Sequence, residues 1–423
     1  MKKIDLVLKE VLKNINPSKE LLENFENSLK NFLIELKKRI KKAHLNVEVF
    51  VGGSFAKKTL IKKDFYDADV FLRFDKKYPN EEISKLTKKL LSGLKFSVVH
   101  GSRDYFQVKV LNNFFIEVVP VMKVSKPEES KNITDLSYSH VKYVNKKIKS
   151  QKILDEIKIA KAFCQANNCY GAESYIGGFS GYGLELLIYN YKSFEKFLKE
   201  MLKFKEKLII DIEKQFKKKN DVMIDLNSSK LESPIVLVDP TYKYRNALAA
   251  LSSETFKKFK DVAKKFLKTP DETYFEKQKI DLNKIKENAL KNKNEFVLLE
   301  ATTSKQERNV AGSKLVKFYR YLGGEFGKYF DIRNKGFNYN HKKSARYFFV
   351  AKPKKEIIFD GPFVNDKENV AKFRKEHKKV SVKGKRLFAK EKVKLNFVDF
   401  VKKWKIKNKK IVKEMYIQEL KII

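Results

Sequence analysis

Three acidic side chains stand in apolar stretches of the sequence, at positions where they could share one site. Asp67 and Asp69 lie two residues apart in DADVFLRF, and Glu117 lies in FFIEVVPV. Successive side chains of a strand point to opposite faces, so Asp67 and Asp69 share a face. Carboxylates held together repel unless a cation lies between them, and a hard divalent ion such as Mg²⁺ prefers oxygen ligands. If the two strands pair, the three carboxylates form a cage for two metal ions.

Two metal ions bridged by carboxylates suit phosphoryl or nucleotidyl transfer. The preceding segment, GGSFAKKTLIKKDFY, contains a glycine turn of the kind that lets a backbone approach phosphates closely. Gly53 gives the backbone that freedom, Ser54 offers a hydroxyl and an amide at a helix start, and Lys57 adds positive charge one turn later. Taken alone, the turn reads as an ordinary strand-to-helix connection, and the aspartates could instead pair with lysines. Together with Glu117, the set favours a metal and triphosphate site.

The composition fits a large globular protein with an anionic partner. The chain has 423 residues, more than one hydrophobic core usually holds. Lysine and arginine number 93 against 52 acidic residues, which gives a formal net charge of +41. Because this charge is spread along the chain, it favours RNA or DNA over a membrane surface. The sequence contains no apolar run long enough for a transmembrane helix, and its first residues carry acidic side chains that a signal peptide lacks.

The cysteines and histidines argue against a disulfide-stabilised protein and against a structural zinc site. Cys164 and Cys169 lie within one predicted helix and its end, a spacing that does not suggest a disulfide framework. We interpret them as packing residues of that helix. The five histidines are scattered, without the spacing of a structural zinc site. We therefore expect a reduced, cytoplasmic protein.

Hydrophobic periodicity predicts the elements that must position the carboxylates. Residues 16–43 are expected to form a helix, with Asn16 as its cap and Pro17 in its first turn. A mixed sheet flanked by helices is predicted over residues 1–125, with strands at 47–51, at 67–74 and three between 94 and 124.

The rest of the chain changes character twice. From about 141 to 215 the pattern is helical, with an interruption at 177–185. Residues 239–246 read as a loop and 247–267 as a helix. From residue 268 onward strands and helices mix, which is typical of an α+β region.

The order of motifs resembles a known family. GGSFAKKTLIKKDFYDADVFLRF resembles the signature of the DNA polymerase β-like nucleotidyltransferases. Four later blocks resemble those of the archaeal-type (class I) CCA-adding enzymes, which are tRNA nucleotidyltransferases: SYSHVKYV, AKAFCQANNCYGAESYIGGFSGYGLELLI, VDPTYKYRNALAALS and GPFVNDKENVAKFRKEHKKVSVKGKRLFAKEK. The signature specifies only the superfamily, whereas the later blocks are far more specific.

The resemblance implies a multidomain α+β fold. Residues 1–140 would form a polymerase β-like catalytic head with a mixed sheet. Residues 141–267 would form a mainly helical neck that binds nucleotide and substrate, and residues 268–423 an α+β body and tail that bind tRNA.

The resemblance also implies roles for individual residues. Asp67, Asp69 and Glu117 would be the catalytic metal ligands for two Mg²⁺ ions, and Arg245 would lie near the nucleobase. The remaining nucleotide contacts would come from Gly53, Ser54, Lys57, Ser137, His140, Lys161 and Tyr170. Taken alone, His140 reads as a surface histidine, Tyr170 as a core aromatic and Lys161 as one solvated lysine among many.

Two positions depart from the family pattern. Lys57 stands where arginine is usual, so bidentate phosphate binding is lost. Glu117 stands where aspartate is usual, and its longer arm shifts the metal-binding oxygen by ~1.5 Å.

The activity implied is addition and repair of the 3′-terminal CCA of tRNA from CTP and then ATP, without a template. The implied partners are tRNA, CTP and ATP but no membrane, and a homodimer is implied by the resemblance alone. Residues 342–361 and 376–394 interleave basic and aromatic side chains, as RNA-binding surfaces do, although such a run is often only a solvated face. Two alternatives stay open: a poly(A) polymerase-like tailing enzyme, and a catalytically silent RNA-binding protein on the same fold.

Overall fold

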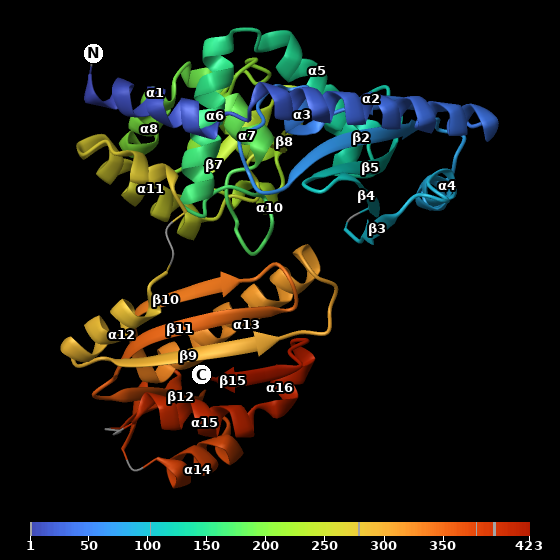
Figure 1. Ribbon diagram of the computed structural model, residues 1–423. Helices are drawn as coiled ribbons and strands as arrows, with labels where there is room; N and C mark the ends of the chain where they lie inside the picture. Colours follow the sequence, from blue (N-terminus) through green and yellow to red (C-terminus); the bar gives the residue numbers. More distant parts are fainter. Residues whose placement is uncertain (1, 102, 278–279, 378, 392–394) are drawn as a thin grey trace. The chain divides into compact units, whose positions relative to one another are not determined.

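The computed structural model describes residues 2–423 apart from 102, 278–279, 378 and 392–394. The chain divides into two compact units, Met1–Gln278 and Lys279–Ile423 (Figure 1). The finer division of the first unit at residue 140, and the expected start of the C-terminal region at residue 268, stay predictions. Among the described residues, none of the helices combines the length and the apolar composition that crossing a membrane requires.

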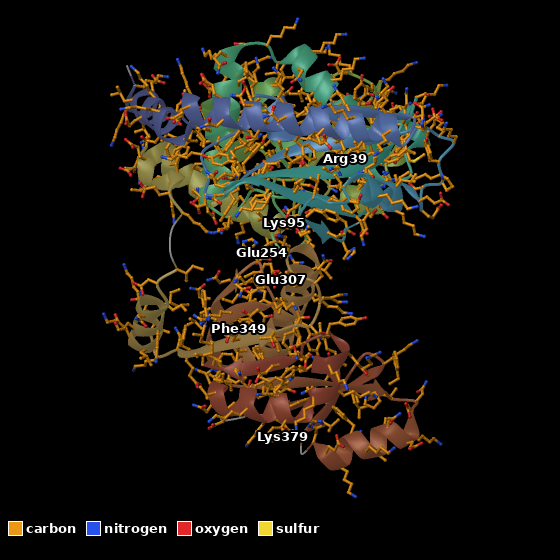
Figure 2. The ribbon with its side chains drawn as sticks, turned by 45° about the vertical axis from the view of Figure 1, so that its right-hand side comes forward. Arg39, Lys95, Glu254, Glu307, Phe349 and Lys379 are labelled. Atoms are coloured by element: carbon orange, nitrogen blue, oxygen red, sulfur yellow. The ribbon has the colours of Figure 1, made fainter. Side chains whose placement is uncertain are left out.

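The first unit begins with two helices, α1 (Lys3–Ile15) and α2 (Lys19–Lys42), rather than one. The predicted helix start at Asn16 was wrong, because Asn16 ends α1. Ser18 caps α2 instead, its hydroxyl accepting a hydrogen bond from the Leu21 backbone N–H at 3.2 Å. Arg39 of α2, labelled in Figure 2, donates to the Ser92 carbonyl at 2.6 Å and ties the end of this helix to the loop after α4 (Ile83–Leu90).

A five-stranded sheet lies beneath α2, as the sequence predicted for residues 1–125. The strands pair in the order β1-β2-β5-β4-β3, and β2 runs parallel to β5. Phe25 of α2 is fully buried and stacks on Phe114 with ring centroids 4.3 Å apart. The strands are β1 (Val47–Val51), β2 (Tyr66–Phe74), β3 (Phe96–Val99), β4 (Tyr105–Leu111) and β5 (Phe114–Met122).

Short elements complete this region. The helical turn α3 (Gly53–Ala56) follows β1 directly. Two 3₁₀ turns, Pro127–Glu129 and Ile133–Leu136, lead from β5 to the next helices.

A helical core follows in the same unit. Its centre is a cluster of fully buried phenylalanines that includes Phe163, Phe179 and Phe259. The free thiols of Cys164 and Cys169 are buried in this core, which confirms their packing role. The helices are α5 (Ser137–Lys147), α6 (Gln151–Ala166), α7 (Gly181–Tyr191), α8 (Phe194–Lys203), α11 (Ser253–Lys268) and the 3₁₀ turn η3 (Glu272–Phe275).

A small second sheet in this unit was not predicted. It pairs β6 (Leu208–Asp211), β7 (Ile235–Asp239) and β8 (Tyr242–Asn246), with the short helices α9 (Lys219–Asp225) and α10 (Ser228–Leu231) between β6 and β7. The predicted loop at 239–246 was wrong, since β8 occupies most of it and pairs with β7. The strands are only four or five residues long, so their periodicity is too short to distinguish them from loop or helix.

The second unit is an α+β structure, as predicted for the C-terminal part of the chain. Its larger sheet has the order β10-β11-β9-β15, and its smaller sheet has the order β12-β14-β13. The strands are β9 (Glu295–Thr302), β10 (Phe330–Tyr339), β11 (Ser344–Pro353), β12 (Ile357–Phe363), β13 (Val380–Lys383), β14 (Arg386–Glu391) and β15 (Glu419–Ile422).

Helices cover this sheet through alternating residues of β11. Phe349, labelled in Figure 2, is fully buried and contacts Tyr319 and Phe326 of α13 (Asn309–Tyr329) at ring distances of 5.6 and 5.2 Å. Phe348 clusters instead with residues of α12 (Leu282–Lys291). The remaining helices are α14 (Lys367–Glu376), α15 (Phe397–Lys407) and α16 (Lys409–Glu414).

Candidate active site

The three carboxylates predicted to share a site are neighbours on one face of the first sheet. In β2, Asp67 and Asp69 alternate with Ala68 and Val70, which are fully buried on the other face. The parallel pairing of β2 with β5 sets Asp69 directly beside Glu117. The predicted strand pairing is therefore confirmed.

The electrostatics of this cluster call for a cation. Burial, followed by the charges of Glu117 and Asp67, raises the pKa of Asp69 to about 7. Asp67 forms an ion pair with Lys63, and Glu117 accepts a hydrogen bond from Gln107 Nε2 at 2.5 Å. Among the described residues, no three acidic, histidine or cysteine side chains are already gathered tightly enough to form a metal cluster. The donor set nevertheless fits a hard divalent cation, because it offers carboxylate oxygens and a shared negative charge.

The glycine turn lies against the carboxylates. Gly52 donates its backbone N–H to the Asp69 carbonyl at 2.8 Å. Gly53 has a positive φ of 65°, and a Cβ added there would lie 1.7 Å from Asp69 Oδ2. Glycine is required at this position by both backbone conformation and space.

A buried ion cluster lies beside this turn. Lys57 Nζ is 2.6 Å from Glu185 Oε2, and Lys161 Nζ is 2.8 Å from Glu185 Oε1. Thr59 Oγ1 donates to Glu185 Oε1 at 3.1 Å and accepts from Lys161 at 2.6 Å. Burial raises the pKa of Glu185, but the charges of Lys161 and Lys57 outweigh it and lower the pKa to about 2. Glu185 is therefore ionised throughout the physiological range.

A second buried carboxylate, Asp239 at the end of β7, gathers His140 and Arg245. His140 Nε2 lies 3.0 Å and Arg245 Nη1 2.6 Å from Asp239 Oδ2. The Tyr182 hydroxyl donates to Oδ1 at 3.0 Å, and the Tyr182 ring stacks on His140 at 4.1 Å. Burial raises the pKa of Asp239, but its hydrogen bond with His140 and the charge of Arg245 lower it overall.

The protonation of His140 follows from this pairing. Burial lowers the pKa of His140 more strongly than Asp239 raises it, so the ring is neutral near pH 7. An ionised carboxylate only accepts hydrogen bonds, so Nε2 carries the proton and donates it to Asp239. The neutral ring then presents Nδ1 as an acceptor. A direct hydrogen bond from His140 to a phosphate requires a second proton on the ring.

The other predicted residues lie around these clusters. Ser54 is half-buried in α3, and Ser137 begins α5. Burial, followed by the charge of Glu185, raises the pKa of Tyr170, so its hydroxyl stays protonated. The charge of Lys57 acts on Asp69, on His140 and on Tyr170, which places the two ion clusters and the carboxylates within electrostatic reach of one another.

Sequence reasoning missed Glu185, Asp239 and Tyr182. Glu185 interrupts the apolar run of GLELLIYN, and Asp239 ends the apolar run IVLVD. A lone acid in such a run needs a partner if it is buried, and this signal, already applied to Glu117, would have found both.

Two family models match the first unit. The model described as "Second Messenger Oligonucleotide or Dinucleotide Synthetase domain" matches residues 1–153. The model described as "tRNA nucleotidyltransferase, second domain" matches residues 155–276. Together they cover the carboxylates and both buried ion clusters.

Proteins of known name show the same similarity. The chain is 40% identical over 242 residues to a CCA-adding enzyme of Nanoarchaeum equitans, and the alignment covers 57% of this chain and 59% of that protein. A CCA-adding enzyme of Methanocaldococcus jannaschii is 27% identical over 398 residues, covering 91% of this chain and 87% of the relative. The match thus spans less than two thirds of the first relative and most of the second.

Solved structures support the fold. A structure of the Cid1 poly(U) polymerase bound to Mg 3′-dATP is similar with a TM-score of 0.51 and 12% identity, covering 66% of this chain and all of that chain. A cytoplasmic RNA terminal U-transferase has a TM-score of 0.50 and 13% identity, covering 66% of this chain and 100% of that chain. At this identity the similarity concerns the fold alone.

Proposed function

We propose that this chain is a member of the family of archaeal CCA-adding enzymes and that it adds and repairs the 3′-terminal CCA of tRNA. The reaction transfers CMP, CMP and AMP from CTP and ATP to the RNA 3′-hydroxyl and releases pyrophosphate. The observation that carries the proposal is the β2–β5 pairing, which aligns Asp69 with Glu117 and leaves Asp67 on the same face. A carboxylate set of this kind suits the binding of two metal ions that assist nucleotidyl transfer.

The acidic cluster would hold the divalent ions that nucleotidyltransferases use, and we assign them as two Mg²⁺. Asp67 and Asp69 would serve both ions, with Glu117 on the ion nearest the primer hydroxyl. When bound, the ions supply activation of the 3′-hydroxyl and neutralise the charge of the leaving pyrophosphate. The raised pKa of Asp69 supports this assignment, because a bound cation relieves the repulsion that burial and its acidic neighbours create.

The chain's own residues bind and orient the nucleotide. The turn at Gly53 and Ser54, together with the ammonium of Lys57, receives the triphosphate. Ser137 and Tyr170 contact phosphate and sugar, while the Nδ1 acceptor of neutral His140 suits a sugar hydroxyl. Arg245 lies near the base, and its Nη1 bond to Asp239 leaves other guanidinium N–H groups for that contact. Lys161 belongs to the same group through its ion pair with Glu185.

Positive charge supports RNA as the polymer substrate. Both units carry nitrogen-tipped side chains over their outer surfaces, which is consistent with a net charge of +41 (Figure 2). In the second unit, residues 342–361 form much of β11 and β12, and 376–394 contain β13 and β14, although 378 and 392–394 lie outside the described residues. We assign tRNA binding to this unit. A cytoplasmic location and a homodimer belong to the same proposal and rest on the family alone.

The test uses a tRNA that lacks its 3′ CCA, with Mg²⁺ and CTP alone, ATP alone or both. Products are resolved at single-nucleotide resolution. Two additions with CTP and a third only when ATP is also present are expected. Long tails with ATP alone would instead identify a poly(A) polymerase-like enzyme. Tight, salt-sensitive tRNA binding without any extension would identify a silent RNA-binding protein.

A further inference from the structure

Glu185 is a fully buried carboxylate whose partners connect two parts of the first unit. It lies on α7, while Lys57 and Thr59 belong to the segment after α3, and Lys161 belongs to α6. Its two oxygens accept hydrogen bonds from all three side chains. The turn that follows β1 is thereby fastened to two helices of the neighbouring core.

The two lysines in this cluster differ in what they can still bind. Lys161 donates to Thr59 Oγ1 at 2.6 Å, to the Thr59 carbonyl at 3.4 Å and to Glu185 at 2.8 Å. An ammonium has three hydrogens, so each already has an acceptor in the protein, and the side chain is only 3% exposed. Lys161 therefore has no ammonium hydrogen left for the direct phosphate contact that the resemblance implied.

Lys57 keeps donors available. Within the described part of the chain, its ammonium makes one hydrogen bond, to Glu185 at 2.6 Å, and its side chain is 10% exposed. It lies one helical turn after Gly53, at the C-terminal end of α3. Two ammonium groups face one carboxylate, so the cluster keeps one uncompensated positive charge. An anion that reaches Lys57 would complete the charge balance.

We propose that Glu185 is a positioning residue for nucleotide binding: anchored by Lys161 and Thr59, it holds the Lys57 ammonium where the triphosphate of the incoming nucleotide docks. Lysine is a point charge on a flexible stem and lacks the rigid fork of arginine, so fixing its position reduces the entropy lost on binding. The identity of the ligand as a nucleoside triphosphate rests on the function proposed above.

The main test replaces the anchor with apolar side chains of similar size, in the variant Thr59→Val/Lys161→Met/Glu185→Met. Removing Lys161 together with Glu185 leaves only Lys57, whose side chain is 10% exposed, without its carboxylate, whereas removing Glu185 alone would leave two unpaired ammonium groups. Binding of CTP with Mg²⁺ is measured by calorimetry, which needs no catalysis. We expect the dissociation constant to rise roughly tenfold, the effect of losing one charged hydrogen bond. The KM for tRNA should stay unchanged.

Lys57→Ala supplies the decisive comparison. In the wild-type background it should also weaken CTP binding roughly tenfold, but in the apolar variant it should add almost nothing, because both changes remove the same contact. Fully additive losses, or an apolar variant that binds CTP as tightly as the wild type, would overturn the proposal.

Two further variants distinguish a specific loss of CTP binding from a general loss of folding. Glu185→Asp keeps the buried charge but withdraws the carboxylate by ~1.5 Å, so CTP binding should still weaken, and unchanged binding would contradict the proposal. Glu156→Gln is the control, since Glu156 lies on α6 and accepts from the Phe194 N–H at 2.7 Å, a contact that involves neither Lys57 nor Lys161. It should bind CTP normally. If the wild type binds CTP but does not extend tRNA, the proposed function fails while this inference is still tested.

Discussion

Replacing Gly53 by alanine should separate catalysis from stability. The added Cβ would lie 1.7 Å from Asp69 Oδ2, and even a separation of 3.0 Å requires the carboxylate to move by about 1.3 Å. A displacement of about 1 Å in a reacting centre costs on the order of 100-fold in rate. The positive φ of 65° adds a strain of about 1 kcal/mol. We therefore expect kcat to fall at least about 100-fold while the protein still folds.

The matched control is Gly93→Ala. Gly93 also has a positive φ, of 80°, but a Cβ there meets nothing within 4 Å. This variant should lose only the ~1 kcal/mol of backbone strain from its unfolding free energy and keep its activity. The assay combines single-turnover extension of tRNA with thermal unfolding of both variants. If Gly53→Ala retains kcat within threefold of Gly93→Ala, the contact between the turn and Asp69 does not position the carboxylate.

Three further predictions concern the buried charges. Because the pKa of Glu185 is lowered to about 2 in the folded protein, ionised Glu185 contributes stability that is fully present above pH 4.5 and disappears as the pH falls toward 2. Between pH 5.5 and 3 the unfolding free energy of the wild type should fall by about 2 kcal/mol through this group, and that of the apolar variant should not, as measured by chemical denaturation. The raised pKa of Asp69 means that its charge destabilises the metal-free protein at neutral pH. Asp69→Asn should therefore raise the unfolding free energy in EDTA at pH 7 by roughly 4 kcal/mol while abolishing extension, and a destabilised variant would contradict this. Asp239→Asn weakens the anchor of Arg245 and should lower kcat/KM for CTP roughly tenfold and admit UTP more readily, whereas unchanged selectivity in competition assays would exclude that role.

The sequence predicted the part of the site that depends on local periodicity. Asp67 and Asp69 share a face because side chains alternate along any strand, and Glu117 stands out as a charge among apolar residues. Placing Glu117 beside the two aspartates required one further assumption, that β2 pairs with β5, and the fold confirms this pairing.

The buried ion clusters depend on contacts between segments far apart in the chain. Glu185 meets Lys57 across 128 positions, and His140 meets Asp239 across 99. Periodicity places each residue on an element but does not reveal which distant element covers it. The same limit explains β8, whose strand conformation depends on its pairing with β7 rather than on its own pattern.

The break between α1 and α2 shows a different limit. Asn16 and Ser18 both favour a helix start, and Pro17 fits either interpretation. Ser18 is the cap of α2 because Asn16 already forms the C-terminal end of the separate helix α1. Capping preferences alone do not distinguish two such neighbours.

The central claim is that Asp67, Asp69 and Glu117 hold the divalent ions of a nucleotidyl-transfer centre. Mn²⁺ binding, measured by electron paramagnetic resonance with a non-hydrolysable CTP analogue, tests it most directly. We predict two bound Mn²⁺ ions per chain in the wild type, loss of both in Asp69→Asn, and loss of one in Glu117→Gln. Unchanged Mn²⁺ binding in Asp69→Asn would contradict the claim.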